Sequence, residues 1–334
     1  MPMLTSEQDF LNMIDRHFPV RADGVLLGRG DDCAILDVLG PLCVSTDLFV
    51  EGAHFRRSYF TPADIGHKAL AAAASDLAAM GAAPVACALS LVLPDDIDDA
   101  FLDELLAGMA ALSRRLGLPL CGGDLSRGPA LILDLAVFGR PGPAGALLRR
   151  GTLRPGDELV LVGDAGLARA GLYALEESGR DALERFPAAT AAHLRPEPRL
   201  NEGQLLAGLP GVRALMDVSD GLARDIPRLL GLGTNLSQGG GKALGADLTI
   251  DESLLHPEAL LFFTARAQTL GQSPVEAFVL GGEDYALLAG VDPSGLALVL
   301  AAMPSARHLG TVSAVPGLRV GGEAFTRAGF DHFG

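Results

Sequence analysis

Two kinds of apolar pattern alternate along the chain: runs spaced for amphipathic helices, and shorter continuous runs typical of buried strands. Both kinds occur in each half of the sequence, so we expect helices and strands to be mixed throughout. In the first half the pattern predicts helices over residues 6–18, 62–80 and 95–116 and strands over 34–36, 42–45, 85–93, 118–121 and 131–139.

The second half repeats this mixture after a Pro- and Gly-rich linker at residues 141–145. A Gly-rich polar stretch at 231–245 is expected to form a surface loop. We therefore predict an α/β (α+β) protein with two domains, residues 1–140 and 149–334. Its second half is predicted to contain strands over 158–162, 213–216, 278–280 and 285–290 and helices over 163–178, 201–209, 222–230, 257–270 and 293–302.

The helix over 62–80 has the clearest end signals. Thr61 is a candidate N-cap, Pro62 suits the first helical position, and Asp64 follows the cap by three residues. Gly81 is a typical stop signal. Both ends of this helix can therefore be placed from the sequence.

Asp76 is the unusual residue of this helix. At 100° per residue it falls on the same face as Ile65, Ala69 and Ala72, a face of small and apolar residues that we expect to be buried. A buried carboxylate is unfavourable unless it is paired or bound to a metal. Asp76 is therefore a candidate functional residue, with a capping or ion-paired Asp as the alternative.

Composition limits the possible partners. The chain has 334 residues, 49% of them apolar, and a formal net charge of −15, which predicts a globular protein large enough for more than one core. Nucleic acids and anionic membranes attract clustered Lys and Arg, so this charge argues against both. An acidic protein can still bind phosphates when Mg²⁺ lies between the two sets of negative charge.

The expected location is the cytoplasm. The four cysteines form no CxxC pair and are interpreted as reduced thiols. The first ten residues lack the basic-then-apolar pattern of a signal peptide. Residues 77–93 are uncharged, but Gly81 and Pro84 interrupt them, so they are interpreted as a helix end and a core strand.

Carboxylates gather in short packets, each flanked by Gly, Ser or Thr, and several follow a predicted strand. Small neighbours allow the backbone to approach a phosphate, and carboxylate and hydroxyl oxygens are the ligands that Mg²⁺ prefers. The packets are Gly30-Asp31-Asp32, Ser45-Thr46-Asp47, Ser75-Asp76, Gly122-Gly123-Asp124, Asp217-Val218-Ser219-Asp220-Gly221 and Gly281-Gly282-Glu283-Asp284.

Phosphoryl transfer is the chemistry that suits these packets. Several Mg²⁺ ions between carboxylates and phosphates would neutralise a triphosphate in a chain that has only two lysines. Either Arg149 or Arg150 could add a planar fork to a phosphate. No P-loop is present, since Gly241-Lys242 is followed by Ala243, and of the seven histidines only His54 lies near a packet.

In their order and spacing the packets resemble those of the thiamine-monophosphate kinase family, which belongs to the PurM-like (aminoimidazole-ribonucleotide-synthetase-like) superfamily. The resemblance covers nearly the whole chain, including residues 51–55, 64–71, 75–82 and 329–333. It implies transfer of the γ-phosphoryl group of ATP to thiamine monophosphate. It also implies a homodimer joined through the sheets of the N-terminal domains.

The resemblance also implies roles for individual residues. Asp47 and Asp220 are the two on which turnover is expected to depend most, and we expect a cleft between the domains. The implied Mg²⁺ ligands are Asp32, Ser45, Thr46, Asp47, Asp76, Asp124, Asp217 and Asp220. The implied ATP contacts are Gly123, Asp124, Arg150 and Ser219, and the implied thiamine phosphate contacts are His54, Glu283 and Phe330.

Some positions depart from the family pattern. His67 stands where the family commonly has Trp, Ala73 where it has Asn, and Leu125 where it usually has Thr. None of these is an implied metal ligand, so they bear on substrate contacts more than on the reaction.

Two alternatives remain open. One is another ATP-using member of the superfamily, although Cys33 and Cys121, the first and last cysteines, do not match the reactive cysteines of selenophosphate synthetase or of the hydrogenase-maturation members. The other is a non-catalytic protein that binds metal and nucleotide on the same scaffold. For a kinase, the acceptor phosphate is already mostly dianionic near neutral pH, so no general base is required. We therefore expect direct in-line transfer without a phosphoenzyme.

Overall fold

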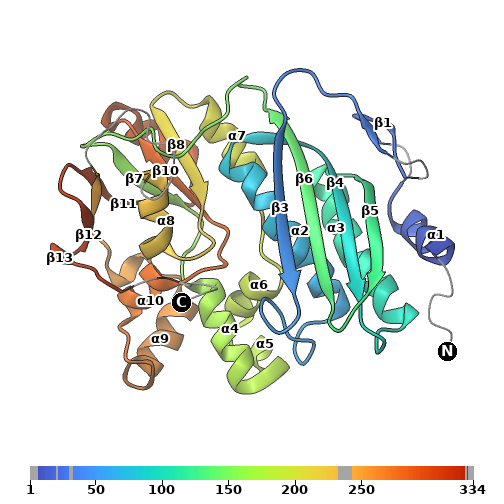
Figure 1. Ribbon diagram of the computed structural model, residues 1–334. Coiled ribbons are helices and arrows are strands. Elements are labelled where there is room, and N and C mark those ends of the chain that lie inside the picture. The colour runs from blue at the N-terminus through green and yellow to red at the C-terminus, as the bar shows by residue number, and fades with distance from the viewer. Residues whose placement is uncertain (1–6, 20–21, 30–32, 232–242, 328, 330–334) are drawn as a thin grey trace. The chain divides into compact units, whose positions relative to one another are not determined.

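The computed structural model describes residues 7–19, 22–29, 33–231, 243–327 and 329. The chain divides into two compact units, whose elements are labelled in Figure 1. The first unit is Met1–Leu77 with Ala82–Pro141, and the second is Ala78–Gly81 with Gly142–Gly334.

The first unit is built on a four-stranded sheet with the strand order β3-β6-β4-β5. Strands β4 and β5 are parallel, and the other neighbours are antiparallel. Helices α2 and α3 cover one face of this sheet (Figure 1). The elements are α1 (Glu7–His17), β1 (Val25–Leu27), β2 (Ile35–Leu36), β3 (Cys43–Val50), α2 (Pro62–Ala79), β4 (Ala82–Leu93), α3 (Asp99–Leu116), β5 (Leu120–Arg127) and β6 (Ile132–Pro141).

Alternation along β6 shows which face is the core. Leu133, Leu135 and Val137 are fully buried, whereas the residues between them are only partly buried. On the other face the β1–β2 ribbon packs Val25 and Leu36 against a small cluster around Val85. The rest of that face carries exposed apolar side chains on the edge strand β3.

The N-terminus of α2 forms as its sequence predicts. Asp64 donates its N–H to the Thr61 hydroxyl at 3.2 Å, and the Asp64 carboxylate accepts the N–H of Thr61 at 3.0 Å. Helices α2 and α3 then touch through glycines: a Cβ at Gly66 would lie 2.1 Å from the Leu105 carbonyl oxygen. The Gly residues therefore permit a close helix crossing that any side chain would block.

The second unit contains a seven-stranded sheet with the order β13-β12-β9-β11-β7-β10-β8. Its neighbours are antiparallel except for β12 and β9. Its elements are β7 (Glu158–Val162), α4 (Leu167–Ser178), α5 (Ala182–Arg185), α6 (Pro187–Leu194), α7 (Leu200–Gly208), β8 (Val212–Asp217), α8 (Leu222–Leu229), β9 (Gly245–Leu248), α9 (Pro257–Leu270), α10 (Pro274–Leu280), β10 (Leu287–Val291), α11 (Leu296–Ala302), β11 (Ala306–Ser313), β12 (Gly317–Val320) and β13 (Glu323–Ala324).

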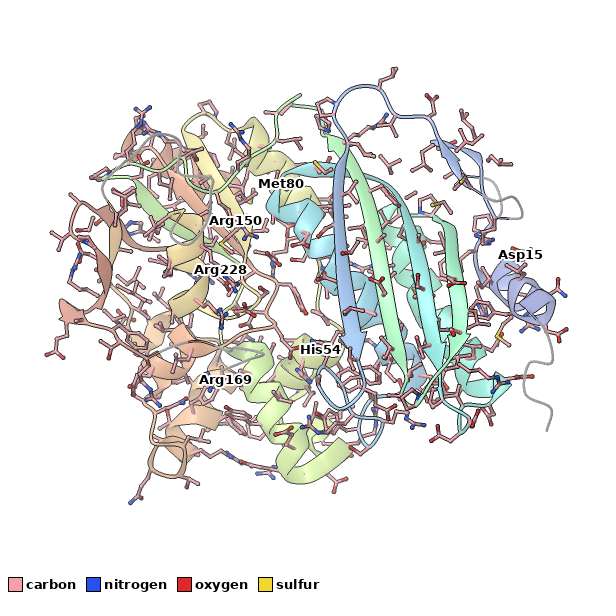
Figure 2. The ribbon with its side chains drawn as sticks, in the orientation of Figure 1. Asp15, His54, Met80, Arg150, Arg169 and Arg228 are labelled. Carbon is pink, nitrogen blue, oxygen red and sulfur yellow. The ribbon has the colours of Figure 1, made fainter. Side chains whose placement is uncertain are left out.

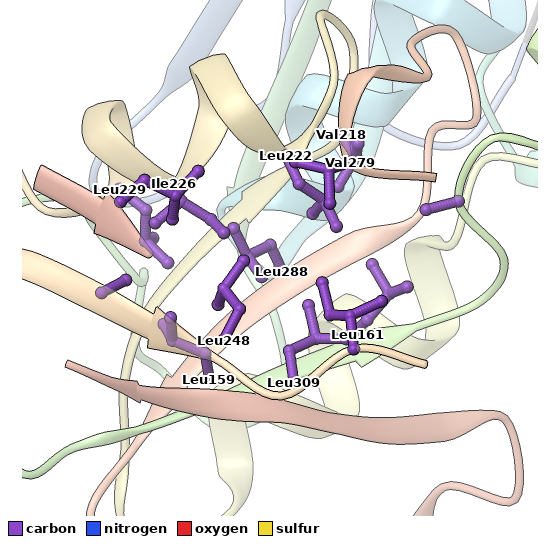
Figure 3. Packing of buried hydrophobic residues seen from close by; sticks show 14 of the residues in the cluster. Leu159, Leu161, Val218, Leu222, Ile226, Leu229, Leu248, Val279, Leu288 and Leu309 are labelled. Atoms are coloured by element: carbon purple, nitrogen blue, oxygen red, sulfur yellow. The ribbon is translucent and has the colours of Figure 1, made fainter. Parts of the chain in front are cut away.

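The core of this unit lies between the sheet and helices α8 and α10. Ile226 and Leu229 of α8 pack onto strand residues such as Leu159 and Leu288, all at most 1% exposed (Figure 3). Burying each such side chain contributes roughly 1.5–3 kcal/mol. This packing anchors α8 directly behind the loop that follows β8.

Three sequence predictions are wrong in detail. The Gly122-Gly123-Asp124 packet lies inside β5, because its residues pair with β4. Residues 278–280 end helix α10, whose N-terminus has a Ser273–Glu276 capping box. Asp76 is only partly buried, on a stripe of α2 with Ala72, while Ile65 and Ala69 are fully buried.

Within the described ranges, no helix is both long and apolar enough to span a bilayer.

Candidate active site

Strand β3 and helix α2 bring three of the predicted residues together in the first unit. Ser45 and Asp47 are two residues apart on β3 and share a sheet face with the buried Phe49. The Ser45 hydroxyl donates a hydrogen bond to the Asp76 carboxylate of α2. Thr46 lies between them in sequence, so its side chain is on the opposite face.

Charge is concentrated at this point. Burial, together with the nearby carboxylates of Asp76 and Asp134, raises the pKa of Asp47 to about 6. Asp134 belongs to β6, where it pairs with Leu48 of β3. The Asp134 side chain therefore lies on the sheet face opposite Asp47, whereas Asp76 lies on the same face as Asp47. A hard divalent ion beside Asp47 and Asp76 would relieve their repulsion.

The carboxylates of the first unit do not by themselves make a complete metal site. Within the described ranges, no group of three or more His, Cys, Asp or Glu side chains is placed to hold one ion. Hydroxyls, water and phosphate oxygens commonly complete Mg²⁺ coordination. The donor set therefore fits Mg²⁺ shared with a phosphate ligand better than a closed protein site.

Gly123 and Asp124 lie on β5, at the far edge of the sheet from β3. Three strand spacings separate β3 from β5, or roughly 14 Å, so Asp124 is not brought together with Asp47. A Cβ at Gly123 would lie 1.8 Å from the Leu89 carbonyl oxygen, which explains the glycine. Asp124 pairs with Ser90 of β4, and Ser90 also pairs with Asp134.

His54 lies in the turn after β3. Its Nδ1 accepts the N–H of Val50 at 2.9 Å, and its ring stacks on Phe49 with centroids 5.8 Å apart. Because Nδ1 is an acceptor, the neutral imidazole carries its proton on Nε2. His54 can therefore offer an N–H donor from a fixed ring.

In the second unit, a buried carboxylate shapes the loop between β8 and α8. Asp225 is fully buried, and its Oδ2 accepts the N–H groups of Ser219 and Asp220, each at 3.0 Å. Burial raises the pKa of Asp225 to about 7. The Asp225 side chain thus fixes the loop backbone that carries Ser219 and Asp220.

Arg228 links the carboxylates of Asp220 and Asp225. Its Nη1 lies 2.6 Å from Asp220 and 3.1 Å from Asp225, and Arg224 lies 3.7 Å from Asp220. Figure 2 shows Arg228 near Arg150, and the N–H of Gly151 bonds to the Leu229 carbonyl at 2.9 Å. Arg150 is partly buried and Arg149 is exposed. Arg224 and Arg228 therefore place positive charge beside Asp220.

The Gly281–Tyr285 turn is bonded to this loop. Glu283 and Tyr285 have φ values of 62° and 49°, which are uncommon for residues with side chains. The N–H of Glu283 bonds to the Ser219 carbonyl at 2.8 Å, and the N–H of Tyr285 bonds to the Val218 carbonyl at 3.0 Å. Backbone strain of this kind persists where surrounding bonds fix it, and it is frequent at functional sites.

Asp284 ties the same turn to a helix. Its carboxylate accepts the N–H of Gly166 at 2.7 Å and that of Ala168 at 2.8 Å, at the N-terminus of α4. Burial raises the pKa of Asp284 to about 7. Asp217, at the end of β8, is 4% exposed. The second unit therefore holds Asp217, Ser219, Asp220 and Glu283 on a pair of interlinked turns.

Two predicted residues cannot be placed, and three residues near the predicted ones were not predicted. Asp32 and Phe330 lie outside the described residues. Sequence reasoning missed Asp134, Asp225 and the buried His193, which contacts Glu283. Only Asp225 had a usable signal, since it interrupts the apolar face of α8 formed by Leu222, Ile226 and Leu229.

Comparison with known proteins adds independent information. The family model described as AIR synthase related protein, N-terminal domain, matches residues 30–140, and the corresponding C-terminal domain model matches residues 154–321. The thiamine-monophosphate kinase of Escherichia coli (strain K12) is 37% identical over 287 residues, which are 83% of this chain and 80% of that protein.

Solved structures agree with the sequence comparison. The crystal structure of thiamine-monophosphate kinase from Stenotrophomonas maltophilia K279a has a TM-score of 0.79 at 28% identity, covering 97% of this chain and 99% of that one. AaThiL complexed with AMPPCP and TMP has a TM-score of 0.74 at 25% identity, covering 98% of this chain and 97% of that one.

Proposed function

The chain belongs to the AIR synthase related family and, within it, to the thiamine-monophosphate kinases, and from this premise we propose how its residues act. The enzyme transfers a phosphoryl group from ATP to thiamine monophosphate, giving thiamine diphosphate and ADP. It is a phosphotransferase with a phosphate group as acceptor. The family and the α/β, PurM-like fold expected from the sequence are thereby confirmed.

The structural observation that carries this function is the pair of carboxylates on β3 and α2. Asp76 bonds to Ser45 and lies close enough to Asp47 to add to the burial that raises the pKa of Asp47. Such repulsion is unfavourable for a purely structural site and is relieved when cations bind. The AaThiL structure, solved with AMPPCP and TMP, supports ATP and thiamine monophosphate as the phosphate ligands.

We propose that Mg²⁺ is the cation. The oxygen donors fit it, and Asp124 lies too far across the sheet from Asp47 to share a single ion, so several ions are required. Bound Mg²⁺ would neutralise phosphate charge during transfer. The proposed ligands are Asp32, Ser45, Thr46, Asp47, Asp76, Asp124, Asp217 and Asp220. Thr46 is proposed for a different ion from Asp47, because its side chain lies on the other sheet face.

We propose that ATP contacts Gly123, Asp124, Arg150 and Ser219. Gly123, which the Leu89 carbonyl requires to be glycine, is assigned a contact through its backbone, and Arg150 supplies a fork of donors for a phosphate. The loop that carries Ser219 is fixed by the buried Asp225, so its groups are oriented before the nucleotide binds. Thiamine monophosphate is assigned to His54, Glu283 and Phe330.

The proposed mechanism is direct in-line transfer. The acceptor phosphate is its own nucleophile, so the residues above need only orient two anions and screen their repulsion. His54 offers a fixed N–H donor rather than a base, which agrees with this role. Inversion of configuration at a chiral γ-phosphorus is the expected result, and retention would indicate a phosphoenzyme.

We also propose a homodimer formed through the open face of the first unit's sheet. Val44 and Leu48 of the edge strand β3 are 57% and 60% exposed on that face. Exposed apolar side chains on an edge strand favour association with a second copy. A cytoplasmic location is proposed because the four cysteines are free thiols.

The direct test is an incubation with ATP, Mg²⁺ and thiamine monophosphate, followed by chromatographic detection of thiamine diphosphate. We expect product in proportion to enzyme and none when thiamine monophosphate is omitted. ATP binding without any product would instead favour a non-catalytic nucleotide-binding protein. Product formed only from a different acceptor would favour another ATP-using enzyme of the superfamily.

A further inference from the structure

His193 is a buried histidine that contacts a residue assigned to the substrate. It lies on α6 and is 1% exposed, and its Nδ1 is 3.3 Å from Oε2 of Glu283. Ninety positions separate the two residues in sequence, so the contact exists only in the fold. Nothing in the mechanism above uses His193.

Glu283 is held at both its backbone and its side chain. Its left-handed backbone is fixed by the bond to Ser219 and by the neighbouring Asp284, which is bonded to α4. Its carboxylate reaches His193, yet the side chain remains 29% exposed. A carboxylate that is tied at one oxygen and still accessible is suited to contact a ligand in a fixed direction.

Charge decides which part of the substrate this carboxylate can face. Thiamine monophosphate joins an anionic phosphate to a permanently cationic thiazolium ring. A carboxylate repels the phosphate and attracts the cation. Building on the proposed function, we propose that His193 is the positioning residue that aims Glu283 at the organic cation of the substrate.

The test is His193→Gln, which keeps a polar side chain of similar length. We expect the KM for thiamine monophosphate to rise about tenfold, the range expected when a polar contact to a charged group is loosened. The KM for ATP and kcat should change less than twofold. Unphosphorylated thiamine, used as a competitive inhibitor, should weaken by the same factor because it keeps the cation and lacks the phosphate.

A matched control is His308→Gln. His308 on β11 pairs with Glu158 on β7 at 2.7 Å, in the same unit but more exposed, so it reports the loss of a His–Glu pair away from the turn. We expect both KM values to stay as in the wild type. Melting temperatures of both variants would show that each is folded.

Glu283→Gln is the second test variant, and it leaves the buried His193 in place. It should raise the same KM, and adding His193→Gln to it should raise that KM no further, because His193 acts through Glu283. Additive effects, or an unchanged KM for thiamine monophosphate in folded His193→Gln, would overturn the proposal. Absence of kinase activity in the wild type would instead overturn the proposed function.

Discussion

The two carboxylates on which turnover is expected to depend most have different surroundings. Asp47 has a raised pKa because it is buried beside two other acids. Asp220 differs, since Arg228 already pairs with it at 2.6 Å. Burial and like charge therefore dominate the surroundings of Asp47, whereas an arginine of the same unit holds Asp220.

Asp225→Asn tests whether the buried acid of α8 orients the loop that carries Ser219 and Asp220. Asn can accept the two N–H groups but presents an amide to Arg228, so we expect kcat to fall about tenfold and the half-saturating Mg²⁺ concentration to rise. Steady-state rates over a Mg²⁺ titration measure both.

Asp157→Asn is its control. Asp157 is 2% exposed, accepts the N–H of Arg154 and pairs with Arg213, all away from the loop. It should lower the unfolding free energy without changing the Mg²⁺ requirement. If both variants lose stability alike and neither changes that requirement, Asp225 has only a structural role.

For individual residues, the sequence predicted which residues belong to the site better than it predicted which side chains they contact. Ser45 and Asp76 are brought together as the packets suggested. His193 could not be predicted, because its contact depends on where α6 lies relative to a turn ninety positions away. Thr46 shows that neighbours in sequence can be separated in the fold. Because it precedes Asp47 directly on a strand, its side chain lies on the other sheet face.

Among the elements, α4 depends on a carboxylate from outside it. Asp284 accepts two N–H groups at the N-terminus of α4, and burial raises its pKa to about 7. The unfolded chain titrates near 3.9, so the folded state binds the proton more tightly. This group's contribution to stability is therefore full below pH 4 and is lost as pH rises through 7.

Asp284→Asn removes that titration. We expect the wild type to lose unfolding free energy relative to the variant by about 1 kcal/mol per pH unit between pH 5 and 7. Urea unfolding of both proteins at several pH values measures the difference. A wild-type-minus-variant difference that does not depend on pH would show that the carboxylate is already ionised at pH 5.

Helices were more predictable than strand positions. The cap and stop residues of α2 and the bounds of α9 follow local chemistry, and both helices form as expected. The end of β5 was placed too early because Gly122 and Gly123 are poor strand formers. Their pairing with β4 is a tertiary interaction that overrides this preference.

For the molecule as a whole, the strand orders and the parallel β4–β5 pair could not be predicted from the spacing of apolar residues. They decide that Asp124 lies across the sheet from Asp47. The reaction and fold were predictable only through the combination of packets, since each packet alone is a weak signal.

Leu48→Glu tests the proposed dimer. Leu48 is 60% exposed on the open sheet face, and a charge there should prevent association, giving half the mass of the wild type. Light scattering after gel filtration should show twice 34.5 kDa for the wild type. Leu261→Glu, 62% exposed on α9, should leave the mass unchanged. A wild type that is monomeric would contradict the dimer.

The central claim is that the carboxylate packets serve phosphoryl transfer and not folding. Its most direct measurement is thiamine diphosphate formation by Asp47→Ala and Asp220→Ala beside the wild type, with urea unfolding of all three. We predict that turnover falls at least a hundredfold in each variant, while the unfolding free energy changes by no more than about 1 kcal/mol. Folded variants that retain wild-type turnover, or variants that lose activity only as they unfold, would contradict the account.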